Sequence, residues 1–210
     1  MGTSCSFYAT YVLPRLIDLA MRSPAATAER RRLIPLASGA VLEIGVGSGL
    51  NIPFYGVGVS RLYALDPSRP LWRLARKQLT SAGFPIEFMA ASAEHIPLGD
   101  MAVDSVVMTW TLCSIPDPVT ALAEMRRVLR LGGRLIFVEH GRSPDEGVCT
   151  WQERLNPLWR RVAGGCNLDR RIDDLIRSAR FDVLQMERAY GGGPKPMAYL
   201  YKGIAVRSGP

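Results

Sequence analysis

The sequence lacks the segments that carry a protein into or through a membrane. No apolar run approaches the 18 residues of a membrane-spanning helix. Pro14, Arg15 and Asp18 interrupt the early apolar stretch that a signal peptide would need. The four cysteines are spread along the chain, as Cys5, Cys113, Cys149 and Cys166. No C-x-x-C pair occurs among them, so their spacing predicts no metal site and no disulfide framework. We therefore expect a cytoplasmic protein with reduced thiols.

Lysine and histidine are also scarce. Only three of the 26 basic residues are lysines, and His95 and His140 are the two histidines of the chain. The net charge of +7 suits an anionic partner, but aromatic residues are not interleaved with the arginines as single-strand stacking would require. The composition therefore disfavours nucleic acid. The 210 residues fit one domain, 1–210, with a sizeable core, and nothing in them fixes an oligomeric state.

A glycine loop follows the first apolar run of the sequence. Residues 41–44 read as a buried strand, and glycines follow at alternate positions in the pattern Glu43-x-Gly45-x-Gly47-x-Gly49. Glycine admits positive φ and lets a ligand approach the main chain. The dinucleotide pattern would require glycine at Leu50, and Pro53 and Gly56 leave room for only about one helical turn. The loop therefore favours an adenosine group without phosphate. Asp66, after the apolar run 62–65, is placed to hold a ribose diol.

This loop resembles motif I of the class I S-adenosylmethionine-dependent methyltransferases. The junction at 127–135, with Gly132-Gly133 between a helix and a strand, is similar to that family too. The resemblance implies S-adenosylmethionine as cofactor and S-adenosylhomocysteine as product. It also implies cofactor contacts from the loops that follow the first four strands: Glu43, Gly45, Val46, Gly47, Gly49, Asn51, Asp66, Pro67, Ser68, Ser92, Ala93, Glu94, Thr109 and Trp110.

Strands alternate with helices along most of the chain. The apolar runs predict strands at 41–44, 62–65, 86–89, 104–108, 134–140, 181–187 and 198–206, and the periodic segments predict helices at 71–79, 117–129 and 172–179. This order predicts an α/β fold with a doubly wound, mostly parallel seven-stranded sheet of Rossmann-like type. The last two strands, joined without a helix, predict a C-terminal antiparallel hairpin.

Two further segments flank this expected core. Residues 1–37 are predicted to form helices, which either cover the cofactor as a lid, with Tyr8 and Tyr11 lining the site, or pack on the sheet. Arg30 to Arg32 are interpreted as a solvated face. Residues 141–168 are too long for a simple loop and form an insertion over the acceptor site. Its apolar positions, Trp151 to Val162, predict a helix that packs on the core or meets a membrane interface.

A sharper resemblance lies in the second half of the chain. The runs 111–114, 137–140, 156–159 and 165–170 are similar to the membrane-associated thiol S-methyltransferases of the methyltransferase-like group. The front of the sequence departs from that pattern, because the hydrophobic N-terminal anchor of those proteins is not seen. Small bacterial phospholipid N-methyltransferases share the general pattern, so the pattern leaves the acceptor open. The tryptophans and flanking arginines of residues 151–162 leave a peripheral contact with a membrane open as well.

These resemblances imply methyl transfer to a small-molecule thiol or sulfide by in-line displacement. The alternatives are N-methylation of a phospholipid or small amine, or methylation of a quinone or phenol. No Asp/Asn-Pro-Pro-aromatic sequence and no Pro-Cys pair is present for base methylation. His140 is the candidate catalytic residue or a histidine satisfied by its neighbours, and His95 is interpreted as structural. Cys166 is either a pocket wall or a small buried residue. The candidate acceptor pocket comprises Tyr8, Tyr11, Leu112, Cys113, Trp159 and Cys166.

Overall fold

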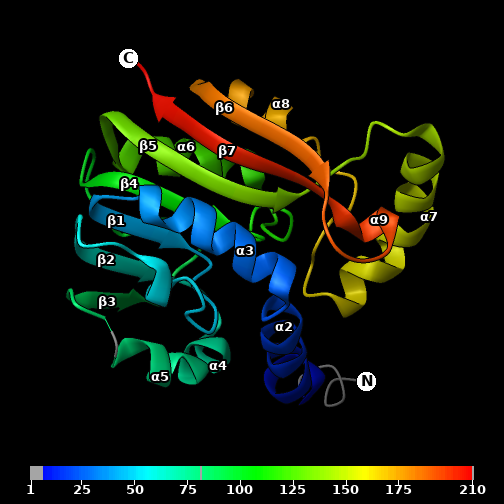
Figure 1. Ribbon diagram of the computed structural model, residues 1–210, viewed down its shortest axis with the longest axis horizontal. Helices are drawn as coiled ribbons and strands as arrows, with labels where there is room; N and C mark the ends of the chain where they lie inside the picture. Colours follow the sequence, from blue (N-terminus) through cyan, green and yellow to red (C-terminus); the bar gives the residue numbers. More distant parts are fainter. Residues whose placement is uncertain (1–6, 81, 210) are drawn as a thin grey trace.

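The computed structural model describes residues 7–80 and 82–209, so Cys5 and positions 1–6 of the predicted lid lie outside the described residues. A seven-stranded sheet runs through the molecule in the order β3-β2-β1-β4-β5-β7-β6 (Figure 1). The strands are β1 (Gly39–Ile44), β2 (Val59–Leu65), β3 (Ile86–Met89), β4 (Val103–Thr109), β5 (Leu129–His140), β6 (Phe181–Tyr190) and β7 (Tyr199–Arg207). The first five pair in parallel, and β7 pairs antiparallel with both β5 and β6. The predicted fold class is confirmed.

Helices cover both faces of this sheet. They are α2 (Leu13–Met21), α3 (Pro24–Leu33), α4 (Arg69–Trp72), α5 (Arg76–Leu79), α6 (Pro118–Val128), α7 (Glu146–Val162), α8 (Ile172–Ser178) and α9 (Lys195–Ala198). In Figure 1, α3 crosses the front of the sheet, α6 and α8 lie behind it, and α7 stands beyond the end where β5 terminates. A π-helical turn, Tyr8–Val12, precedes α2, and 3₁₀ turns lie at Ile34–Leu36, Ile52–Phe54 and Arg73–Ala75.

The core has two layers because successive strand residues point to opposite faces. On one face, Val41 and Val107 pack with Ile34 at the end of α3. On the other, Leu42 and Val106 pack with residues of α6 and α8. Because helices cover both faces of the sheet, residues that point to either face are apolar. The strands therefore appear in the sequence as continuous apolar runs.

Strand order reverses between β1 and its two neighbours, β2 and β4. The chain leaves β1 toward one edge of the sheet and returns after β3 to build the other side. Such a reversal opens a crevice outside the carboxyl ends of the strands, where ligands bind in open α/β sheets. The glycine loop after β1 lies at this crevice.

Three predicted boundaries are wrong in detail. The helix expected over 71–79 is broken into α4, a 3₁₀ turn and α5. Arg69 and Arg73 lie one turn apart in that segment, and such like-charge pairs disfavour a continuous helix. Helix α6 ends at Val128, and β5 starts at Leu129, ahead of the Gly132-Gly133 pair that was expected to separate them. The final strands are linked through the one-turn helix α9, where no helix was expected.

Helix α7 buries a polar edge and only part of the apolar stripe that was expected to pack on the core, because Leu155 and Trp159 are half-buried. Trp151, Leu158 and Val162 are exposed, whereas Gln152 and Asn156 are buried. The two buried amides hold the helix by satisfying main-chain groups: Gln152 accepts from the N–H of residue 143, and Asn156 accepts from the N–H of residue 168. Burial of these polar side chains is stable because each is hydrogen-bonded.

Candidate functional site

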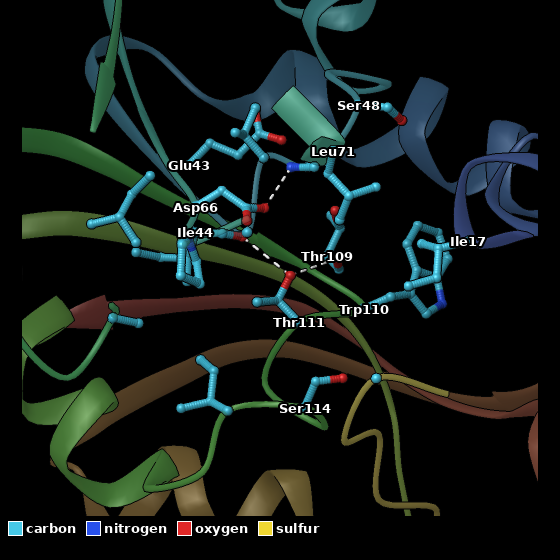
Figure 2. Close-up of a pocket in the computed structure, with 18 of the residues that line it drawn as sticks. Ile17, Glu43, Ile44, Ser48, Asp66, Leu71, Thr109, Trp110, Thr111 and Ser114 are labelled. Carbon is cyan, nitrogen blue, oxygen red and sulfur yellow. Dashed lines mark hydrogen bonds between the residues drawn. The ribbon is translucent and has the colours of Figure 1, made fainter. Parts of the chain in front are cut away.

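A cavity of ≈ 320 Å³ opens at the carboxyl ends of β1, β2 and β4. Its floor is the glycine loop after β1, and its sides come from the loops after β2, β3 and β4 (Figure 2). Ile17, Asp18 and Met21 of α2 close one side, and Ala163 and Gly164 after α7 close another. The cavity therefore sits where strand order reverses, and residues of both flanking segments line it.

The three loop glycines adopt backbone conformations that other residues resist. Gly45, Gly47 and Gly49 have φ values of +68°, +54° and +73°. A Cβ on Gly45 would lie 2.4 Å from Oγ1 of Thr111, so that position requires glycine for close packing as well. A Cβ on Gly47 would have no atom nearer than 3.9 Å. The loop thus leaves open space over Gly47, at the cavity floor.

Asp66 ties the end of β2 to this loop. Its Oδ2 accepts the N–H of Gly47 at 2.8 Å, and its Oδ1 accepts the N–H of Ser68 at 2.6 Å. Burial raises the pKa of the Asp66 carboxyl, and the two backbone N–H groups oppose that rise. Each carboxylate oxygen keeps a further lone pair, so the group can accept two hydroxyl hydrogen bonds from a diol in the cavity.

A buried polar network lies under the loop. Asn51 donates from Nδ2 to Oε1 of Glu43 at 2.9 Å and to Oγ1 of Thr109 at 3.0 Å, and its Oδ1 accepts from Nε of Arg30 at 2.9 Å. Tyr55 donates to Oε2 of Glu43 at 2.7 Å. Burial raises the pKa of Glu43 to about 7 and lowers that of Arg30 to about 10. Glu43 and Asn51 line the cavity, but their hydrogen-bonding capacity is largely spent on holding the loop.

The interpretation of Arg30 to Arg32 as a solvated face is wrong for Arg30. Its side chain is buried, it donates to the carbonyl of Met21 at 2.6 Å, and its guanidinium lies 5.0 Å from the ring centroid of Trp110. It therefore joins the network to the end of α2 and to the loop after β4. Arg31, its exposed neighbour, is the solvated residue that the pattern predicted.

The loop after β3 closes the cavity beside Asp66. Ser92, Ala93 and Glu94 all line it. The Ser92 hydroxyl hydrogen-bonds to the Glu94 carboxylate, which also accepts the N–H of Asp117 at 3.2 Å. These contacts fix the loop against the start of α6.

The loop after β4 supplies the opposite wall. Trp110 has φ of +51° although it is not glycine, and its N–H donates to the carbonyl of Val138 at 2.7 Å. Thr111 follows and donates to the carbonyl of Ile44 at 3.2 Å (Figure 2). Non-glycine residues with such strained backbone angles cluster at ligand-binding and active sites, which agrees with the position of Trp110 in the cavity wall.

Glu139 fixes this wall from behind, a role that sequence reasoning missed. Its buried carboxylate accepts the N–H of Thr111 at 2.8 Å and that of Cys113 at 3.3 Å. Burial raises the pKa of Glu139 to about 8. An acidic residue in an otherwise apolar strand end was the available signal.

Cys113, His140 and Cys166 form a cluster behind the same wall. Their ligand atoms lie within 4.8 Å of one another, and the two sulfurs are 3.3 Å apart. The hydrogen bond between the thiols lowers the pKa of Cys166 to about 5 and raises that of Cys113 well above its usual range. His140 also packs against Trp110, with ring centroids 6.5 Å apart.

The structure gathers the predicted residues into two places. Most of the predicted cofactor residues line the cavity directly, while Gly49 and Ser68 support its floor from outside. The predicted catalytic and acceptor residues do not line it: they are His140, Tyr8, Tyr11, Leu112, Cys113, Trp159 and Cys166. Tyr11 is exposed, and Tyr8 donates to the carbonyl of Val162 at 2.8 Å, which joins the N-terminal segment to α7.

A family model described as a methyltransferase domain matches residues 42–137. Over 170 residues the chain is 37% identical to the thiol S-methyltransferase TMT1B of Homo sapiens, a match that covers 78% of this chain and 68% of that protein. The chain belongs to the S-adenosylmethionine-dependent methyltransferases. It spans between 62% and 68% of the length of the mammalian thiol methyltransferases that it matches.

Other methyltransferases resemble this one as well. A phosphatidylethanolamine N-methyltransferase of Cereibacter sphaeroides is 29% identical over 157 residues, which is 74% of this chain and 76% of that protein. A solved structure of the 1,6-didemethyltoxoflavin-N1-methyltransferase of Burkholderia thailandensis, with 1,6-didemethyltoxoflavin and S-adenosylhomocysteine bound, has a TM-score of 0.69 at 18% identity. That match covers 97% of this chain and 86% of the other, and it shows a shared fold.

The cavity of this methyltransferase fits its methyl donor. The open space over Gly47 admits a ligand against the main chain, and Asp66 is free to accept a diol. Among the described residues, Arg30 is the one cation that lines the cavity, and its guanidinium is held by Asn51 and Met21 beside the Trp110 ring rather than left for a pyrophosphate. Among the described residues, no helix combines the length and apolar character needed to cross a bilayer.

Proposed function

We propose that this methyltransferase transfers the methyl group of S-adenosylmethionine to the sulfur of a small-molecule thiol, with S-adenosylhomocysteine as the second product. The observation that carries the proposal is the 37% identity to a thiol S-methyltransferase over 78% of this chain. That match is longer and of higher identity than the match to the phosphatidylethanolamine enzyme.

The residues that would hold the donor are those at the cavity floor. Asp66 would accept the ribose hydroxyls, the Gly45–Gly49 loop would contact the donor through its main chain, and Ser92 to Glu94 would border the adenine. The donor supplies an activated methyl group on a sulfonium. The protein's contribution is therefore alignment of the acceptor and exclusion of water.

The acceptor would enter between α2 and the segment after α7. Ile17, Met21, Ile115 and Ala163 give this part of the cavity an apolar lining. Such a lining suits an alkyl thiol, because the sulfur carries little charge until it ionises. The two predicted covers, residues 1–37 and 141–168, both reach the cavity, and we propose that they act together as its lid.

The acceptor must lose a proton as the new carbon–sulfur bond forms. A thiol is only a few per cent ionised at neutral pH, so a group that promotes ionisation raises the rate. His140, beside Trp110 of the cavity wall, is the residue to which we assign that task. As the new carbon–sulfur bond forms, the sulfonium–carbon bond of the donor breaks, and the thiol proton passes to His140.

A lipid amine is the second acceptor that a specific observation favours. Exposed apolar residues occur on the N-terminal segment and on α7, which the Tyr8–Val162 hydrogen bond joins: Phe7, Tyr11, Leu16, Leu19, Trp151, Leu158 and Val162. Exposed apolar and aromatic residues on neighbouring helices suit a membrane interface. The match to a phosphatidylethanolamine N-methyltransferase supports the same alternative.

The decisive experiment compares acceptors that differ in one atom. Labelled donor is incubated with the protein and with a thiol, an alcohol or an amine on the same alkyl chain. The proposal predicts labelled thioether from the thiol and background label from the other two. Equal labelling of the amine, or labelling of none, contradicts it.

A further inference from the structure

Three metal-ligating side chains converge behind the cavity wall. Cys113 comes from the loop after β4, His140 ends β5, and Cys166 follows α7. Their ligand atoms all lie within 4.8 Å of one another. Both cysteines are buried and the histidine is half-buried. Two soft sulfur ligands and one imidazole at a single point are the donors that zinc prefers.

The distances fit a tetrahedral ion with little rearrangement. Zinc–sulfur bonds of about 2.3 Å and zinc–nitrogen bonds of about 2.0 Å place the ligand atoms roughly 3.5–3.8 Å apart. The sulfurs of Cys113 and Cys166, 3.3 Å apart, need to separate by only a few tenths of an ångström. Rotation of the half-buried His140 ring can bring its nitrogen to the remaining ligand distance.

The main chain around the two cysteines is already fixed. Asn167 donates from both its N–H and its Nδ2 to the carbonyl of Cys113, each at 2.8 Å, and Cys166 donates its N–H to the carbonyl of Ala163 at 3.2 Å. Such hydrogen bonds hold the ligand-bearing segments together before any ion binds. A site organised in this way loses less entropy on binding.

An unpartnered donor points to the same cluster. The indole Nε1 of Trp159 is buried and has no hydrogen-bond partner among the described residues. It lies beside the Cys166 thiol. An N–H beside a thiolate ligand is a common outer partner in metal sites, so an ion bound here would give this donor an acceptor.

We propose that Cys113, His140 and Cys166 bind one thiophilic divalent cation, with Zn²⁺ as the ion that this donor set favours. Two thiolates, a neutral imidazole and the ion form a centre of zero net charge, which suits a buried position. The ion would join the loop after β4, the end of β5 and the segment after α7. The cysteine spacing gave no hint of this site, because its ligands are 27 and 26 residues apart in the sequence.

Three protein ligands leave one position of a tetrahedral zinc ion open. Ser114 and Gly164, which lie next to the cluster in sequence, line the cavity. A thiol acceptor bound to the open position would lose its proton to solvent at neutral pH, because the ion would promote its ionisation. His140 would then be a ligand, and the ion would take over the ionising role proposed for that histidine. This use of the ion rests on the proposed function; the metal site itself does not.

The test measures metal in the full chain without substrate. The protein is purified with reductant after growth in zinc-supplemented medium, and zinc is determined by mass spectrometry. We expect about one equivalent per chain. Replacement of zinc by Co²⁺ should give thiolate-to-cobalt charge-transfer bands and the visible bands of a tetrahedral ion.

Variants identify the ligands. Cys113→Ser and Cys166→Ser should each lose most of the bound metal, whereas Cys149→Ser, which changes a buried cysteine outside the cluster, should keep it. His140→Cys should also keep the metal, because it replaces one ligand with another, whereas His140→Ala should weaken binding.

Several results would overturn the proposal. The wild-type spectrum is decisive whether or not the variants fold: cobalt-loaded protein without thiolate charge-transfer bands contradicts the site. A Cys113–Cys166 disulfide that persists in protein purified with reductant contradicts it as well. Protein that holds zinc but methylates no thiol contradicts the proposed acceptor alone, and metal-free protein that methylates thiols contradicts the metal site alone.

Discussion

Oδ2 of Asp66 accepts the main-chain N–H of Gly47 at 2.8 Å. The carboxylate that ends β2 thus holds the centre of the glycine loop that follows β1. The same group faces the cavity, so one side chain both shapes the floor and stays available to a ligand.

Replacement of Asp66 with Asn should weaken binding of S-adenosylhomocysteine by about 10–100-fold. An amide offers only one acceptor oxygen to the N–H groups of Gly47 and Ser68, and charged hydrogen bonds contribute about 1.5–3 kcal/mol each. Titration calorimetry measures the effect. Asp100→Asn changes an exposed carboxylate and is the control. Unchanged affinity in the Asp66 variant would remove it from the site.

Alanine at Gly45 and alanine at Gly47 should behave differently. A Cβ at Gly45 collides with Thr111, so we expect a loss of stability above about 2 kcal/mol. A Cβ at Gly47 meets nothing in the unliganded protein, so its cost is the left-handed backbone, roughly 1 kcal/mol, together with lost ligand affinity. Denaturant melts and ligand titration of both variants separate the two effects. If Gly47→Ala binds S-adenosylhomocysteine like the wild type, the ligand does not lie over this glycine.

Arg30 should matter far more than Arg31. Its loss leaves Oδ1 of Asn51 and the carbonyl of Met21 without their buried partner, which typically costs about 2–4 kcal/mol. We expect Arg30→Ala to lower the free energy of unfolding by that amount and to weaken ligand binding. Arg31→Ala, on the exposed side of the same helix, should change neither. Equal stability of the two variants would restore the interpretation of a solvated run.

The buried Glu43 predicts a pH dependence of stability. Its pKa is raised from 4.5 to about 7 in the folded state, so between these values the folded protein keeps a proton that the unfolded chain has lost. The retained proton stabilises the folded protein by at most about 3 kcal/mol. This stabilisation is complete below pH 4.5 and is lost as pH rises to about 7.

Glu43→Gln removes this titrating group. The free energy of unfolding of the wild type should therefore fall relative to that of the variant as pH rises from 4.5 to about 7. The measurement is a set of denaturant melts of both unliganded proteins. Other raised groups, such as Glu139, are present in both and cancel in the difference. Parallel stability curves would show that Glu43 titrates normally.

Sequence reasoning predicted the sheet, the glycine loop and the loops around the cavity because these rest on local patterns. Apolar runs identify the strands, and the glycines before Pro53 identify the truncated turn, which the structure confirms as Ile52–Phe54. Local pattern also identified the acidic end of β2. Each of these signals lies within a few residues of the feature that it predicts.

What could not be predicted depends on contacts between distant segments. Arg30 is buried because Asn51, 21 residues away, offers it an acceptor. Part of the apolar stripe of α7 is exposed because Gln152 and Asn156 find main-chain partners in loops that only the fold brings near. Burial decided by partners far along the chain leaves no mark in local periodicity.

A competition reaction shows which acceptor receives the methyl group. The full chain is given trideuteromethyl-labelled donor, a small alkyl thiol and phosphatidylethanolamine vesicles in one mixture, and the products are identified by mass spectrometry. A thiol S-methyltransferase should give the labelled thioether as the main product and little labelled lipid. Labelled lipid amine with no thioether would contradict it.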